Sequence, residues 1–312
     1  MCSYCFVKLK YDIANIERGE GAGALLNFIQ GKRDKTTNWC DWNIPIHWGG
    51  VSDPFQHIEK IHKYSLQALK VFAETQYPVV ISTKGALAAE EPYLSLLGKC
   101  NVVMQFSLVS PKFDKIEPGA PTFEQRIEMI RKIAPKVKRV IVRTQPFVLE
   151  AQSDILKQIK LYKDIGVYGI TVEGLKYRQK KPGLVKIGAD YCYPKETLKN
   201  AYEQIKNECH KHGLSFYAAE NRLRSMGDDL CCCGIDGLEG FTPNKYNLNH
   251  YIFDRKNFVA SGSMKEPGTS MCLKAVAQNT SSVEVFKIKS LDEMMQAATK
   301  DKGMIGQLVS KQ

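Results

Sequence analysis

The sequence predicts an α/β protein whose parallel sheet curls into a full or partial barrel. Short runs of β-branched residues alternate with amphipathic helical stretches between residues 43 and 220. Glycines stand where several of these helices should end, and polar residues follow several of the strands. This alternation is typical of βαβ units, and parallel sheets of this kind place their chemistry at the carboxyl ends of the strands.

The predicted elements follow one another in a regular order. Strands are expected at residues 43–48, 78–83, 101–108, 139–144, 168–174 and 214–220. Helices are expected at residues 57–75, 91–98, 122–133, 153–166 and 195–213. Pro121 precedes the third of these helices, and Gly166 and Gly213 occupy the C-cap positions of the last two.

The pattern changes after residue 221, where the chain becomes rich in Gly, Asp and Asn. A last helix is expected from Ser290, because Ser290 and Glu293 fit a capping box. We therefore predict a barrel domain over residues 1–221 and a C-terminal extension, a Cys-rich loop followed by a helix, over residues 222–312.

Composition narrows the class of protein. Apolar content of 44% and charged content of 25% are ordinary for a globular chain of 312 residues. Since no apolar run approaches the roughly 18 residues of a membrane span, no membrane partner is expected. Ten cysteines without a signal-peptide pattern predict a reducing, cytoplasmic location. The net charge of +11 favours an anionic partner such as DNA or RNA.

The first residues, "MCSYC", raise the question of metal binding. Cys2 and Cys5 form a C-x-x-C pair, which can hold half a zinc site, form a redox disulfide or supply two ligands of an iron–sulfur cluster. The alternative is that both are incidental thiols.

Single polar or charged groups fall at the ends of the predicted strands. Because one face of a barrel carries all of these ends, a common site is predicted there, although each charge alone is also typical of a rim salt bridge. The charged residues are Lys84, Arg143 and Glu173, and the polar ones are Ser52 and Ser107. Gly49 and Gly50, after the first strand, would let a ligand approach the backbone closely.

Several motifs, in order, resemble the radical S-adenosylmethionine superfamily, and within it the spore photoproduct lyase and DNA-repair-photolyase-like branch. "CSYC" matches the second half of the family's C-x-x-x-C-x-x-C cluster motif. "SDPF" (52–55), "STKG" (82–85) and "ITVEGLKYR" (170–178) resemble further segments of the lyases. The best match is "MQFSLVSPKFDKIEPGAPTFEQRIE" (104–128), with its F-S-[IL], E-P-G and R-I-E elements. The resemblance covers roughly residues 1–180.

The resemblance implies a partial (β/α)6 TIM-like barrel and two cofactors. Three thiolates of the family hold a [4Fe–4S] cluster, S-adenosylmethionine binds its open iron, and reductive cleavage yields a 5′-deoxyadenosyl radical that abstracts hydrogen from the substrate. Cys2 and Cys5 are the implied cluster ligands. Cofactor binding is expected from Gly49, Gly50, Ser52, Lys84, Ser107, Arg143 and Glu173, with Lys84 paired to the carboxylate of S-adenosylmethionine.

Two departures from the family pattern lead to further expectations. The first motif cysteine would lie three residues ahead of Met1, and the first barrel strand is also missing, so we expect an N-terminally truncated chain. Such a chain should hold little stable cluster and should not cleave S-adenosylmethionine. Gly50 stands where the lyases carry their hydrogen-donor cysteine, so a different substrate or a different hydrogen donor is required.

The run "CCCG" begins with three consecutive cysteines, Cys231, Cys232 and Cys233. Their spacing is not that of a standard metal site, which favours free thiols in a loop near the site. One or two of them joining His210, His212 or a distant Cys around a metal, or one donating hydrogen to the substrate, are the alternatives.

The predicted function is therefore a lyase-like radical enzyme acting on a nucleic-acid lesion, served by an external electron donor such as flavodoxin or ferredoxin. The alternatives are a radical enzyme for a peptide or small molecule, and an inactive fragment or zinc-dependent nucleic-acid-binding protein.

Overall fold

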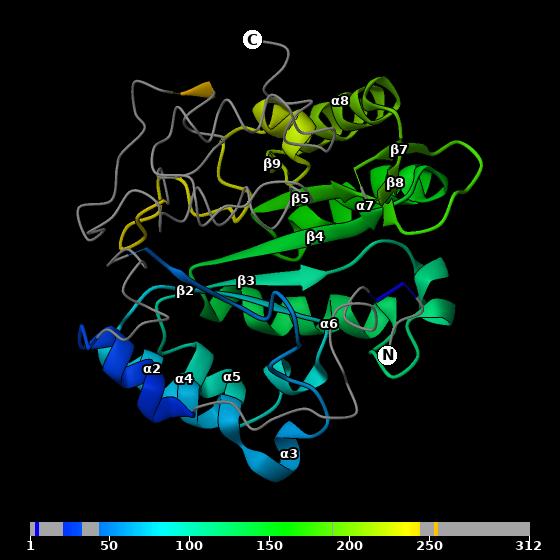
Figure 1. The fold of residues 1–312 in the computed structure, drawn as a ribbon. Helices are drawn as coiled ribbons and strands as arrows, with labels where there is room; N and C mark the ends of the chain where they lie inside the picture. The colour runs from blue at the N-terminus through cyan, green and yellow to red at the C-terminus, as the bar shows by residue number, and fades with distance from the viewer. Residues whose placement is uncertain (1–3, 6–20, 33–43, 189, 244–252, 255–312) are drawn as a thin grey trace.

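A six-stranded parallel sheet organises the chain (Figure 1). The computed structural model describes residues 4–5, 21–32, 44–188, 190–243 and 253–254. The strand order is β1-β2-β3-β4-β5-β9, and every neighbouring pair is parallel. The bounds are β1 (Ile46–Trp48), β2 (Val79–Thr83), β3 (Val102–Ser107), β4 (Arg139–Phe147), β5 (Gly169–Gly174) and β9 (Ser215–Ala218). All six are predicted strands, so the α/β class is confirmed.

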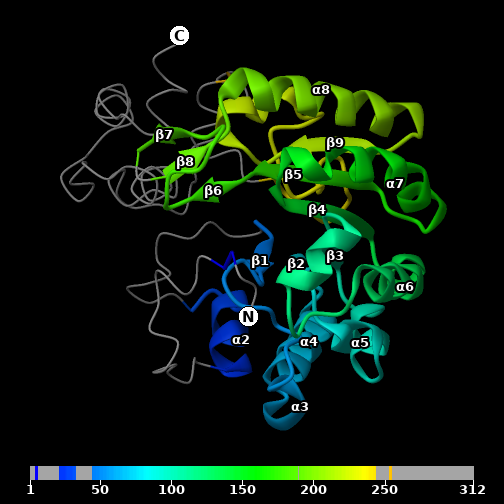
Figure 2. The same ribbon diagram turned by 90° about the vertical axis from the view of Figure 1, so that its right-hand side faces the viewer.

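Helices cover one face of this sheet and form an arc around it, as expected for a partial barrel (Figure 2). They are α3 (Glu59–His62), α4 (Tyr64–Thr75), α5 (Tyr93–Leu97), α6 (Phe123–Ile133), α7 (Gln152–Asp164) and α8 (Lys195–Lys211). Alternate strand residues such as Met104 and Val142 point into the main hydrophobic core with helix residues such as Ile130 and Ile159. These four side chains are fully buried.

The single helix predicted over residues 57–75 is wrong in one respect. Lys63 has a left-handed backbone conformation, with φ of 54°, and separates α3 from α4. The buried carboxylate of Glu59 explains the break, because it accepts hydrogen bonds from the backbone N–H groups of Ser65 and Leu66, both at 2.9 Å. These bonds satisfy donors in the first turn of α4 that have no partner within the helix.

The predicted end signals of three helices are confirmed. Helix α6 begins directly after Pro121 and Thr122, and Thr122 and Gln125 form a capping box that was not predicted. Gly166 and Gly213 lie just beyond α7 and α8 with φ of +88° and +69°.

One helix and one small sheet among the described residues were not predicted. Helix α2 (Ala22–Ile29) packs against α4. A small antiparallel sheet of order β6-β8-β7 follows β5 and extends away from the main sheet (Figure 2). Its strands are β6 (Lys176–Tyr177), β7 (Val185–Ile187) and β8 (Asp190–Cys192), each too short to give a clear alternating pattern.

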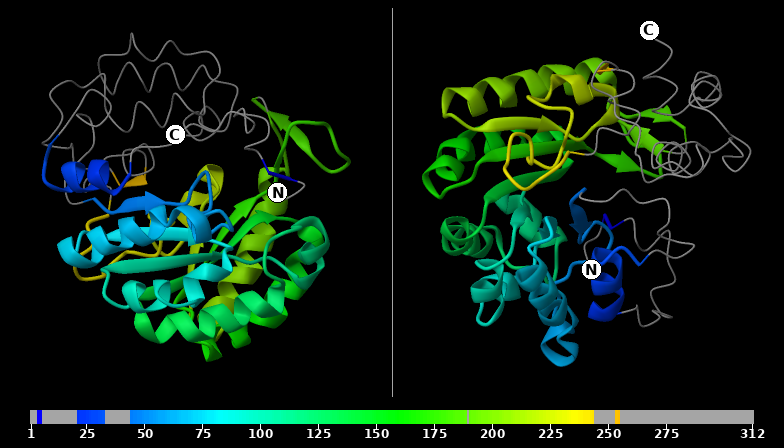
Figure 3. Two further views of the ribbon diagram at one scale, coloured as in Figure 1. Left: turned by 90° about the horizontal axis from the view of Figure 1, so that it is seen from below. Right: turned by 90° about the vertical axis from the view of Figure 1, so that its left-hand side faces the viewer.

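The segment 227–243 covers part of the sheet face opposite the helices, called the inner face below (Figure 3, in yellow). Ile235 and Phe241 form a buried cluster with Val80, Val103 and Ile141 of three neighbouring strands. Charge and hydroxyl contacts fasten the segment. Arg139 donates to the carbonyl oxygens of Gly234 (3.0 Å) and Asp236 (2.8 Å), and the Tyr217 hydroxyl donates to Asp236 (2.7 Å).

The segment 227–243 of the predicted extension 222–312 thus packs on the sheet. The helix predicted from Ser290 lies outside the described residues, as do Met1, Cys2 and Cys40. No helix in the described ranges combines the length and apolar character needed to cross a membrane.

Candidate functional site

A row of polar side chains crosses the inner face near the carboxyl ends of the strands. His47 of β1 and Ser82 of β2 lie 2.8 Å apart, and Ser82 donates to Gln105 of β3 at 2.9 Å. Because the single hydroxyl proton of Ser82 goes to Gln105, the ring Nε2 of His47 carries a proton and donates to Ser82. Arg143 of β4 donates to the same Gln105 oxygen at 3.4 Å.

Arg143 and Glu173, both predicted site residues, continue this row. Arg143 Nη2 lies 3.2 Å from Glu173, and Gln145 bridges the pair by accepting from Arg143 (2.6 Å) and donating to Glu173 (2.7 Å). Lys176 donates to the other carboxylate oxygen of Glu173 at 2.6 Å. Burial alone would raise the pKa of Glu173, but Lys176 and Arg143 outweigh it and hold this pKa below its usual value. Arg143 and Glu173 thus form a largely buried ion pair.

The cysteine run lies against this row. The carbonyl of Cys232 accepts from Thr171 Oγ1 (2.8 Å) and Gln105 Nε2 (3.4 Å), which fixes the backbone of the loop on the inner face. A hydrogen bond from Cys233 lowers the pKa of the Cys232 thiol, and the guanidinium groups of Arg224 and Arg143 add to the effect and outweigh burial. The pKa of Cys233 is raised by its hydrogen bonds to Cys231 and Cys232.

The two shifts predict unequal thiol reactivity. We expect iodoacetamide at neutral pH to alkylate Cys232 well before Cys233, because the thiolate is the nucleophile. Arg224→Gln should slow the reaction of Cys232 several-fold by raising its pKa. Peptide mass spectrometry over a pH series measures both rates. Cys100, whose pKa burial raises to about 12, is the internal reference that should stay unreacted. Alkylation of Cys233 ahead of Cys232 would contradict this assignment.

A second group of predicted residues lies on the loop after β1. Gly49 has φ of +94° and lies so close to β2 that a Cβ would stand 2.1 Å from the Ser82 carbonyl oxygen. A Cβ on Gly50 would meet nothing within 4 Å, and Ser52 is exposed. Gly49 is therefore required by the fold itself, whereas the open side of Gly50 leaves room for a ligand.

Asp53 fastens this loop to the end of β2. Its carboxylate accepts from the Thr83 hydroxyl (2.7 Å) and from the backbone N–H groups of Lys84 (2.6 Å) and Phe55 (2.9 Å). Asp53 is not among the predicted site residues, although its position in "SDPF" directly before a proline is a turn signal.

Lys84 and Ser107 lie at the carboxyl ends of β2 and β3, and Lys84 contacts Tyr4, the residue before Cys5. The ammonium group of Lys84 lies 3.6 Å from Glu117 and 5.8 Å from the ring centroid of Tyr4. Cys5 follows Tyr4 directly and is a free, half-buried thiol. The carbonyl of Ser107 accepts from Arg126 at 2.9 Å. Cys2 lies outside the described residues.

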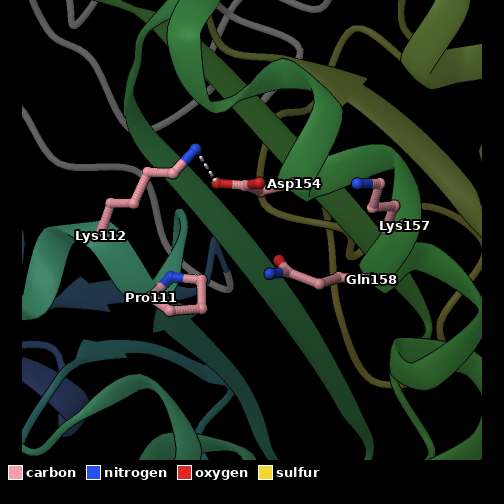
Figure 4. A pocket seen from close by; sticks show the side chains of 5 residues that line it. All are labelled: Pro111, Lys112, Asp154, Lys157 and Gln158. Carbon is pink, nitrogen blue, oxygen red and sulfur yellow. Dashed lines mark ion pairs between the residues drawn. The ribbon is translucent and has the colours of Figure 1, made fainter.

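Sequence reasoning missed His47, Ser82, Gln105 and Thr171. The sequence did offer a signal for Gln105, because a polar amide interrupts the otherwise apolar run "VVMQF". This side chain is fully buried in the structure. Within the described ranges, no three His, Cys, Asp or Glu side chains converge as metal ligands would. A separate shallow pocket between η2 (Pro111–Ile116) and α7 contains the Lys112–Asp154 ion pair of 3.0 Å and no predicted site residue (Figure 4).

The fold and the site define an α/β protein with a polar, charged site at the carboxyl ends of a parallel sheet. No protein-family model matches the sequence, and no curated protein matches it. Solved structures with a similar fold include Streptococcus suis SuiB bound to the precursor peptide SuiA (TM-score 0.49, 11% identity) and SuiB bound to S-adenosylmethionine (TM-score 0.48, 11% identity). They cover 70% of this chain, which spans 45% and 47% of the length of those two chains.

Proposed function

We propose that the chain is the core of a radical S-adenosylmethionine enzyme. The observation that supports the proposal is the set of contacts made by Tyr4, the residue before Cys5. The sequence motif predicts a cluster ligand at Cys5, and Tyr4 contacts Glu117 and Lys84, the residue that follows β2. Lys84, which directly follows β2, and Ser107, the last residue of β3, were predicted from other motifs.

The residues present suit the two cofactors in kind. Thiolates are the ligands that iron–sulfur clusters use, and the sequence supplies Cys2 and Cys5 of the three that the motif needs. The open side of Gly50, with Ser52, Lys84, Ser107, Arg143 and Glu173, would hold the polar groups of S-adenosylmethionine. When bound, the cluster and S-adenosylmethionine supply one-electron chemistry that removes a hydrogen atom from a substrate.

The chain's own residues would orient these groups and exclude water. Glu173 stays ionised between Arg143 and Lys176, so it offers a fixed negative charge for an amine or a hydroxyl group. The hydrogen bonds from Thr171 and Gln105 to its carbonyl hold the backbone of Cys232 in place on the inner face. The buried cluster around Ile235 and Phe241 keeps water from the opposite half of the inner face.

The test is reconstitution with iron and sulfide under anaerobic conditions. A protein extended by Cys-Xaa-Xaa ahead of Met1 completes the motif and is expected to show iron–sulfur absorbance and to release 5′-deoxyadenosine from S-adenosylmethionine. Cys5→Ser should abolish both signals. An extended protein that binds no iron, or that binds iron without cleaving S-adenosylmethionine, would contradict the proposal.

Lys84 offers a sharper test of the binding mode. Lys84→Ala in the reconstituted extended protein is expected to weaken S-adenosylmethionine binding by roughly tenfold or more, because the cofactor carboxylate loses a cation. Calorimetry measures the affinity. Lys112→Ala, which removes an exposed lysine from another ion pair, is the control and should leave it unchanged. Equal affinities for Lys84→Ala and the unsubstituted protein would remove Lys84 from the site.

For the substrate, modification of a peptide or small molecule is the better-supported choice. Gly50 replaces the donor cysteine of the lyases, and no comparison supports repair of a nucleic-acid lesion. The solved SuiB structure holds a precursor peptide. Salt-sensitive binding of single-stranded DNA by the full chain would favour a nucleic acid instead.

A further inference from the structure

The side chain of Tyr4 is held by two segments that are distant from it in sequence: Lys84, after β2, and residues 113–117, at η2. Its hydroxyl donates to the Glu117 carboxylate. Its ring packs edge-on against Phe113 of η2, with the centroids 6.0 Å apart and an interplanar angle of 64°. The Lys84 ammonium group lies 5.8 Å from the centre of the same ring. The residue before Cys5 is thus attached to the sheet end by a charged acceptor, an aromatic contact and a cation.

The carboxylate of Glu117 is itself held by Arg126. Its side chain is 1% exposed and lies 2.7 Å from Arg126 Nη2, and the Arg126 side chain is also 1% exposed. Arg126 in turn donates to the Ser107 carbonyl at 2.9 Å and lies 3.4 Å from Asp114. A buried carboxylate with one immobile cationic partner keeps acceptor capacity on its other oxygen. That oxygen, Oε1, is the one that receives the Tyr4 hydroxyl and faces Lys84.

We propose that Glu117 is a positioning residue that holds Tyr4, and with it the adjoining backbone of Cys5, near the ends of β2 and β3 by accepting the Tyr4 hydroxyl. Arg126 acts through Glu117 by fixing its carboxylate. This gives the E-P-G and R-I-E segments of the sequence one physical purpose, because Glu117 and Arg126 belong to them. The purpose of holding Cys5 rests on the proposed function, whereas the clamp between Tyr4 and Glu117 does not.

The clamp is tested on the full chain without any cluster, through the reactivity of Cys5. Tyr4→Phe removes only the hydroxyl and leaves Glu117 paired with Arg126 and Lys84. Alkylation of Cys5 by iodoacetamide, followed by peptide mass spectrometry, is expected to become about tenfold faster or more, since a hydrogen bond to a charged group contributes at least that factor to the closed state. Tyr177→Phe, in β6 of the small antiparallel sheet, is the matched control and should leave the Cys5 rate unchanged.

Two measurements separate the clamp from general destabilisation. Cys100 and Cys209 are buried, so their continued protection in Tyr4→Phe shows that the core is intact. Glu117→Gln keeps an acceptor oxygen, so it should raise the Cys5 rate less than Glu117→Leu does. An unchanged Cys5 rate in Tyr4→Phe would overturn the clamp. A faster Cys5 reaction in a chain whose extended form never cleaves S-adenosylmethionine would keep the clamp and overturn the proposed function.

Discussion

Replacing Arg126 with methionine is expected to lower the free energy of unfolding by about 3–5 kcal/mol, the cost of removing one partner of a buried ion pair. The substitution leaves the carboxylate of Glu117, 1% exposed, without the cation that lies 2.7 Å away. It also removes the donor to the Ser107 carbonyl. Urea denaturation followed by circular dichroism measures the change.

The control for this experiment lies on the same helix. Arg131 forms an exposed pair with Glu128 at 3.4 Å, so Arg131→Met should cost about 0–1 kcal/mol. In the double variant Arg126→Met with Glu117→Gln, part of the loss should be recovered, because no buried charge remains unpaired. A cost for Arg126→Met no larger than that for Arg131→Met would show that the ion pair contributes little to stability.

Gly49→Ala is expected to destabilise the protein by about 2–6 kcal/mol, from backbone strain at positive φ plus overpacking. A Cβ at this position would lie 2.1 Å from the Ser82 carbonyl oxygen and 3.1 Å from the Pro54 ring. Since the carbonyl belongs to β2, the loop would have to leave the strand end. Thermal or urea unfolding detects the loss.

The neighbouring residue supplies a control one position away. Gly50→Ala should change the free energy of unfolding by less than about 0.5 kcal/mol, because its Cβ would meet nothing within 4 Å. In the reconstituted extended protein, Gly50→Ala also tests whether a ligand occupies the open space beside Gly50. Similar unfolding free energies for the two variants would mean that the close approach of Gly49 to β2 does not constrain the loop.

The strand pattern could be predicted from sequence because each strand is a short β-branched run between turn signals. "VVIST" and "VVMQFS" are examples, and both become parallel strands of the sheet. The break at Lys63 could not be predicted in the same way. It depends on the Glu59 side chain folding back to the first turn of α4, a tertiary arrangement that also involves the Tyr93 hydroxyl at 3.0 Å.

Residues of the candidate site could be predicted where they lie at or near the end of a predicted strand. Lys84 directly follows β2 and Glu173 is the penultimate residue of β5, as predicted. The strand end predicted at Arg143 is wrong, because β4 continues to Phe147, but Arg143 is in register with Ser107, the last residue of β3. The partners of Cys232 were not predictable, because Gln105 lies 127 residues away and no local pattern links the two. The Tyr4–Glu117 contact spans 113 residues and has the same origin.

The inner face has a consequence for biosynthesis. Val80, Val103 and Ile141 are covered by Ile235 and Phe241, which are synthesised far later. At about 5–20 residues per second, the ribosome needs roughly 8–30 s to reach Phe241 after Val80. During that interval the nascent sheet presents an uncovered apolar strip. Chaperone capacity during translation should therefore set the yield of folded protein more strongly than the stability of the finished fold does.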